Sequence, residues 1–134
     1  MAPTYRYHDG VIRSEIKPGS STFFKTLSNQ EIIMYVKSTY LEISPLHRIV
    51  YTQEFVDKDE KTARHPGAPL FPGALKTTVV LAEEGPDQTR VTVTMEPFGE
   101  TTAEEVAAIM NERPGMTLGW TGSFDKLEEV LTKL

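Results

Sequence analysis

The C-terminal segment, residues 116–134, constrains the fold more than any other stretch of the chain. Its large apolar side chains recur at steps of three and four residues, which places them on one stripe of an α-helix. The stripe consists of Met116, Trp120, Phe124, Leu127, Val130, Leu131 and Leu134. Because it carries the only tryptophan of the chain, we expect it to pack on a large apolar surface, with Trp120 largely buried.

Most of the chain before this segment has the alternating pattern of β-strands. Strands are expected at residues 5–17, 22–27, 31–43, 48–57, 74–83 and 89–98. Asp9-Gly10 is a turn signal inside the first of them. A short helix is expected at residues 103–112, capped by Thr101 or Thr102 and ended by Pro114-Gly115. The pattern predicts one α+β domain over residues 1–134, in which a curved antiparallel sheet wraps around a long C-terminal helix.

Composition narrows the classes of partner and compartment. The net charge of −5 argues against nucleic acid or an anionic membrane as a partner, because both favour a basic surface. No stretch is apolar for long enough to span a membrane, and the first residues lack the apolar run of a signal peptide. The chain has no cysteine, which is consistent with a reducing compartment. We therefore expect a cytoplasmic protein.

The sequence offers little support for metal or nucleophilic chemistry. His8, His47 and His65 are too far apart in sequence to form a metal motif on one element, so no metal site and no cofactor are expected. There is no Gly-x-Ser-x-Gly elbow and no glycine-rich phosphate loop. His65, in the proline-rich loop at residues 58–73, is a candidate acid or base at a cavity mouth, although a solvated loop histidine is the commoner case.

Strand alternation also predicts which side chains face the helix. Tyr40, Tyr51 and Gln53 bring hydroxyl and amide groups to an otherwise apolar face. A cavity lined by aromatic side chains with a few polar groups suits a planar organic ligand, whereas simple core packing is the alternative for each residue. The candidate cavity-lining residues are Met34, Tyr40, Tyr51, Gln53, Phe55, Met95, Trp120 and Phe124.

Four stretches, in order along the chain, resemble one known family. Lys17-Pro18-Gly19-Ser20 is similar to its Arg-Pro-Gly-Gly turn, and residues 36–45 are similar to its Gly-x-Tyr-x-Glu-Ile-x-Pro strand end. Residues 48–52 resemble the next strand, and Gly119-Trp120 with the apolar positions that follow resembles the C-terminal signature. The family comprises homologues of the activator of the heat-shock-protein-90 ATPase, within the START-like superfamily of polyketide cyclases and the birch-pollen allergen. Ser20 and Ser38 stand where the family usually has glycine.

The resemblance implies a helix-grip fold with a cavity between the sheet and the terminal helix. Superfamily members bind lipids, hormones or aromatic polyketides, and some catalyse cyclisation or hydration. The expected function is therefore binding of a small hydrophobic or aromatic molecule, and the residues do not distinguish a binder from an enzyme. The alternatives are a chaperone-associated interaction module, as the family name suggests, and a structural fragment with no activity of its own.

The resemblance also concerns the beginning of the chain. The family normally starts with one strand and two short helices that have no counterpart here. Their absence would leave a sheet edge near residues 5–17 and a flank of the long helix uncovered. We therefore expect a two-fold homodimer that covers one of them, or a fold-back of residues 1–7 in place of the missing strand.

Overall fold

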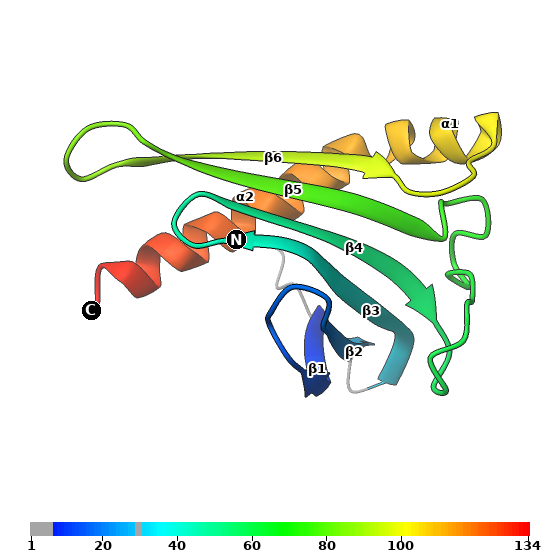
Figure 1. Ribbon diagram of the computed structural model, residues 1–134. Helices are drawn as coiled ribbons and strands as arrows, with labels where there is room; N and C mark the ends of the chain where they lie inside the picture. The colour runs from blue at the N-terminus through cyan, green and yellow to red at the C-terminus, as the bar shows by residue number, and fades with distance from the viewer. Residues whose placement is uncertain (1–6, 29–30) are drawn as a thin grey trace.

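The computed structural model describes residues 7–28 and 31–134 as a six-stranded antiparallel sheet with two helices. The strands follow one another in space in the order of the sequence, as a meander (Figure 1). The elements are β1 (Tyr7–Ser14), β2 (Ser21–Ser28), β3 (Glu31–Ser44), β4 (Arg48–Val56), β5 (Ala74–Glu83), β6 (Thr89–Pro97), α1 (Ala103–Asn111) and α2 (Arg113–Leu131).

The long helix α2 lies on one side of the sheet and runs diagonally behind it in Figure 1. This arrangement confirms the predicted α+β helix-grip class. No helix in the described part of the chain is both long enough and apolar enough to cross a membrane.

Strand pairing shows which side chains share the face toward α2. Tyr51 is paired with Tyr40 on β3 and with Thr77 on β5, and Thr77 is paired with Met95 on β6. Directly paired residues point to the same side of a sheet. The Sδ atom of Met95 lies 3.2 Å from the indole nitrogen of Trp120 in α2, so this side is the helix-facing side. The predicted alternation along β4 is therefore correct.

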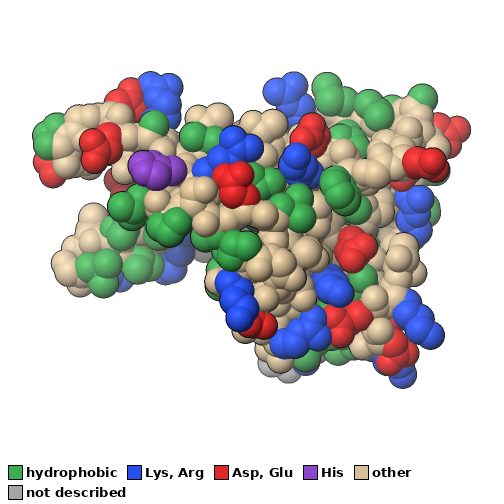
Figure 2. Space-filling model, in the orientation of Figure 1, with side chains coloured by type: hydrophobic (Ala, Val, Ile, Leu, Met, Phe, Trp, Pro, Cys, Tyr) green, Lys and Arg blue, Asp and Glu red, His purple; other side chains and the backbone are tan. Residues whose placement is uncertain are grey.

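Buried side chains lie on both sides of the sheet. On the helix-facing side they are Thr22, Met34, Val36, Ser38, Leu75 and Thr77; on the outer side they are Phe23, Val50 and Val56. Figure 2 shows the outer side, where charged side chains of both signs are interspersed with apolar ones. The core is thus divided between two faces, and each face needs its own cover.

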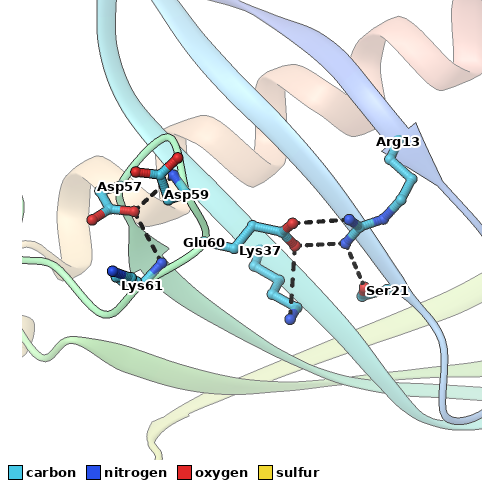
Figure 3. Close-up of polar contacts among 7 residues, drawn as sticks. All are labelled: Arg13, Ser21, Lys37, Asp57, Asp59, Glu60 and Lys61. Carbon is cyan, nitrogen blue, oxygen red and sulfur yellow. Dashed lines mark hydrogen bonds and ion pairs between the residues drawn. The ribbon is translucent and has the colours of Figure 1, made fainter.

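Part of the outer side is covered by the loop after β4. Glu60 at the tip of this loop accepts from both terminal nitrogens of Arg13 in β1, at 2.9 and 2.7 Å, and lies 3.8 Å from Nζ of Lys37 in β3 (Figure 3). Arg13 also lies over the ring of Phe23, 5.8 Å from its centroid. The backbone N–H groups of Asp59 and Lys61 donate to the Asp57 carboxylate, which shapes the turn. These contacts tie β1 to the middle of the sheet.

Two boundaries differ from the sequence prediction. Asp9-Gly10 is not a turn but lies within β1, which is bulged between Val11 and Arg13. A Cβ atom on Gly10 would lie 2.9 Å from Cε of Lys25 in the paired strand, so glycine allows that side chain to cross the strand. Helix α2 begins at Arg113 and includes Pro114 in its first turn, where the missing N–H removes no helical hydrogen bond.

The apolar stripe of α2 packs less than the sequence predicts. None of its side chains is fully buried, and Trp120 is covered in part rather than completely, so the expectation of a largely buried tryptophan is met only in part. The stripe divides along its length, because Met116, Trp120 and Phe124 are partly covered whereas the later positions are exposed. The exposed positions are Leu127, Val130, Leu131 and Leu134. The expected fold-back of residues 1–7 falls almost wholly outside the described residues.

Candidate functional site

An open groove of about 620 Å³ lies between β6 and the two helices. We call it the β6–helix groove. Its walls are mainly apolar, and the polar side chains along them are those of Arg113, Thr117 and Thr121 from α2. Thr94 and Glu96 of β6 also border the groove, but their side chains point to the other side of the sheet. The apolar lining comprises Val91, Val93, Met95 and Pro97 from β6, Val106, Ile109 and Met110 from α1, and Met116, Trp120 and Phe124 from α2.

Local sequence signals place each wall of the groove. Alternation along β6 turns its odd-numbered side chains toward the helices. Helix α1 starts with a capping box, in which the Thr102 hydroxyl accepts from the N–H of Glu105 and the Glu105 carboxylate accepts from the N–H of Thr102, both at 3.1 Å. The chain turns directly from α1 into α2 at Glu112, so the two helices line the groove in succession.

Helix α1 is also fixed from outside by the loop before β5. Nη1 of Arg64 donates to the Glu105 carboxylate at 2.7 Å and to the carbonyl of Phe71 at 3.0 Å. The Arg64 hydrogen bond holds the pKa of the Glu105 carboxyl below its usual range, and the backbone N–H of Thr102 adds to this effect. Residues 57–73 therefore hold the helix that forms one wall of the groove.

Trp120 is the largest side chain that lines the groove. Its ring stacks on Phe124, with centroids 5.6 Å apart and an angle of 27° between the planes. Its indole N–H donates to the thioether sulfur of Met95, which is a weak hydrogen-bond acceptor. A ligand oxygen would be a better acceptor at this position.

A second set of polar groups lies on the helix-facing side nearer the centre of the sheet. The Thr22 hydroxyl is 2.8 Å from the Tyr40 hydroxyl and 2.9 Å from that of Ser14, and Nε2 of Gln53 donates to Ser38 at 3.2 Å. Tyr40 and Gln53 thus have partners within the sheet. Packing within the core, the alternative to ligand contact, therefore accounts for these two side chains, and their polar groups are satisfied there.

Tyr51 and Thr77 differ from this pattern. Burial raises the pKa of the Tyr51 phenol, and the neighbouring Thr77 hydroxyl partly opposes the shift. The two groups do not reach full hydrogen-bond geometry, so the fully buried Thr77 oxygen has no partner among the described residues. This hydroxyl is an unsatisfied polar atom on the helix-facing side of β5.

The structure distributes the eight candidate residues over three places. Met95, Trp120 and Phe124 line the β6–helix groove, and Gln53 and Phe55 line a smaller cavity of about 260 Å³. Met34, Tyr40 and Tyr51 share the helix-facing side but line neither space.

The candidate set did not include the residues that α1 contributes to the groove. Val106, Ile109 and Met110 follow helical spacing, so their apolar stripe was visible in the sequence. What the sequence did not show is that α1 and α2 would line one space together. Val91 and Val93 share the helix-facing side of β6 with Met95, and the three side chains form the floor of the groove.

His65 lies away from the groove. Its ring contacts Phe55 edge to face, with centroids 5.4 Å apart, and its Nδ1 atom accepts from the N–H of Gly67 at 3.0 Å. It lines neither the groove nor the smaller cavity, which removes the geometric support for an acid or base role there. Among the residues that the structure describes, no three His, Asp or Glu side chains gather as metal ligands.

A family profile matches nearly the whole chain. Residues 4–132 match the family described as Activator of Hsp90 ATPase homolog 1-like protein. The chain belongs to this family. The START-like resemblance drawn from the four motifs is therefore correct. A search of curated proteins gives no match.

Two solved structures share the fold of this family member. The crystal structure of protein CV1439 from Chromobacterium violaceum matches with a TM-score of 0.61 at 20% sequence identity, covering 90% of this chain and 70% of that one. A solution NMR structure from Staphylococcus epidermidis matches with a TM-score of 0.60 at 24% identity, covering 84% of this chain and 63% of that one. At these identities the likeness concerns the fold alone, and the chain spans about two thirds of either protein.

Proposed function

We propose that this protein binds a small hydrophobic or aromatic molecule in the β6–helix groove. The observation that carries the proposal is the position of Trp120 in a mainly apolar groove, with its indole N–H donated only to a thioether. A volume of about 620 Å³ lies within the range of roughly 300–1,000 Å³ that small-molecule sites occupy. Membership of a START-like family supports the same class of ligand.

The groove favours a particular arrangement of ligand atoms. An aromatic ring can lie against Phe124 and the indole of Trp120, while a carbonyl or hydroxyl oxygen replaces Met95 as the acceptor of the indole N–H. Arg113, at the start of α2, offers a cation for an acidic substituent at one end. The proposal covers binding and assigns no reaction.

Fluorescence of Trp120, the only tryptophan, tests the proposal directly. Titration with 2-naphthol and with 1-anilinonaphthalene-8-sulfonate should quench or shift its emission in a saturable way. Thr117 lines the groove, so Thr117→Phe should fill it and weaken binding about tenfold or more. Thr132→Phe, at the C-cap of the same helix and outside the groove, is the matched control and should leave affinity unchanged. A linear, non-saturable response to both probes would contradict the proposal.

A further inference from the structure

Strand β6 ends the sheet with backbone groups that no described residue satisfies. The N–H of Phe98 donates to the carbonyl of Ala74 at 3.0 Å, and the N–H of Glu84 donates to the carbonyl of Gln88 at 2.9 Å. In an antiparallel pair such bonds alternate, so the even-numbered residues of β6 are those bonded to β5. The backbone groups of Val91, Val93 and Met95 therefore point out of the sheet. Figure 1 shows β6 at the upper edge, with α1 beyond its C-terminal end.

This edge has few of the features that protect an edge strand. Its pairing with β5 runs without a bulge from Thr89 to Pro97, and its nine residues span about 30 Å at roughly 3.4 Å each. Proline occurs only at the last position. The other edge, β1, is interrupted by its bulge. A long, regular edge such as β6 is a template for another strand.

We infer that β6 pairs antiparallel with β6 of a second copy of this chain, about a two-fold axis through Val93. In that register Val93 faces its own copy, each Val91 faces Met95, and both use the outward backbone groups. Arg90 then faces Glu96 at each end of the paired strands. Both side chains are exposed, at 65% and 58% of the side-chain surface. Of the two-fold registers open to this strand, only the one centred on Val93 joins these opposite charges.

The pairing would also complete the groove, and this step rests on the proposed function. The side chains of Val91, Val93 and Met95 form the floor of the groove and point to the helix-facing side. In the paired strands Val91 of the second copy lies beside Met95 at the open margin of the groove. Each copy therefore extends the apolar floor of the other.

Light scattering after size-exclusion chromatography, without any ligand, tests the pairing. The parent chain should elute with twice the mass of the 15.0 kDa monomer. Val93→Pro should give a monomer with an unchanged circular dichroism spectrum, because the N–H that it removes is not bonded to β5. Arg90→Glu should weaken the dimer about tenfold or more by placing two carboxylates opposite each other, and Arg90→Glu combined with Glu96→Arg should restore it.

Glu84→Gln is the matched control for the charge reversal. It removes the partner that Arg90 has within its own chain but leaves the proposed pairing intact, so the dimer should persist. The inference would be overturned if the parent chain were a monomer at all concentrations up to about 1 mM, or if Val93→Pro left the dimer unaffected. It would also be overturned if the double charge reversal dimerised no more strongly than Arg90→Glu alone. These results need no ligand, so they leave the binding proposal untouched. Conversely, an intact dimer that binds neither fluorescent probe would overturn the binding proposal alone.

Discussion

At the residue scale, two buried threonines on the helix-facing side have opposite surroundings. Thr22 bonds to Ser14 and Tyr40, whereas the Thr77 hydroxyl is buried without a partner among the described residues. Replacing an unsatisfied buried hydroxyl by a methyl group of the same shape removes a desolvation cost. We expect Thr77→Val to raise the free energy of unfolding by about 1 kcal/mol, measured by urea denaturation. Thr22→Val should lower it by a similar amount. Equal losses for both variants would contradict the unsatisfied state of Thr77.

Trp120 gives the second prediction at this scale. Because it is half-buried, Trp120→Ala should lower the free energy of unfolding by about 1–3 kcal/mol, less than the roughly 3–5 kcal/mol expected for a fully buried aromatic side chain. Leu131, on the same stripe but 57% exposed, is the control, and Leu131→Ala should change stability by no more than about 0.5 kcal/mol. Urea denaturation of the three proteins measures both values. Similar losses at both positions would mean that the whole stripe is covered in solution.

At the element scale, the attachment of α1 should depend on pH. The folded-state pKa of Glu105 is lowered, first by Arg64 and then by Thr102, and that of Glu60 is lowered by Arg13. A depressed carboxyl pKa gives stability that is present above the unfolded-state value and lost as pH falls through the folded-state value. We expect the melting temperature to be steady near neutral pH and to fall below about pH 4. Glu105→Gln should reduce this dependence, because the glutamine side chain does not titrate. A melting temperature that rises on acidification would contradict the assignment.

Sequence patterns predicted the elements better than their contacts. Alternation gave the six strands and the face of Tyr51 correctly, because a side-chain period of two fixes the face once the strand is known. Helical spacing predicted α2 correctly but not how closely the helix packs on the sheet. An apolar stripe does not show how far along the helix the sheet extends. Gly10 was misread because a glycine needed for close approach in a strand has the same local signature as a turn glycine. The sequence predicted only some of the residues that line the groove, because the lining depends on how α1 is placed against β6.

At the scale of the whole molecule, the sheet and the long helix should differ in local stability. The buried side chains of β3, β4 and β5 belong to a continuous hydrogen-bonded sheet, whereas α2 has no fully buried residue. Regions with little buried apolar contact open with small free energies. We therefore expect amide hydrogens of α2 beyond Phe124 to exchange much faster than those of β4.

Hydrogen exchange followed by mass spectrometry measures this difference, and β4 serves as the internal reference. A ligand in the β6–helix groove should slow exchange around Trp120, which lines the groove, and have little effect near Leu131 and Leu134, which do not. Protection that extends to the exposed end of the helix in the absence of ligand would contradict the predicted gradient. It would also show that the exposed apolar stripe, which the described residues leave uncovered, is buried in solution against another surface.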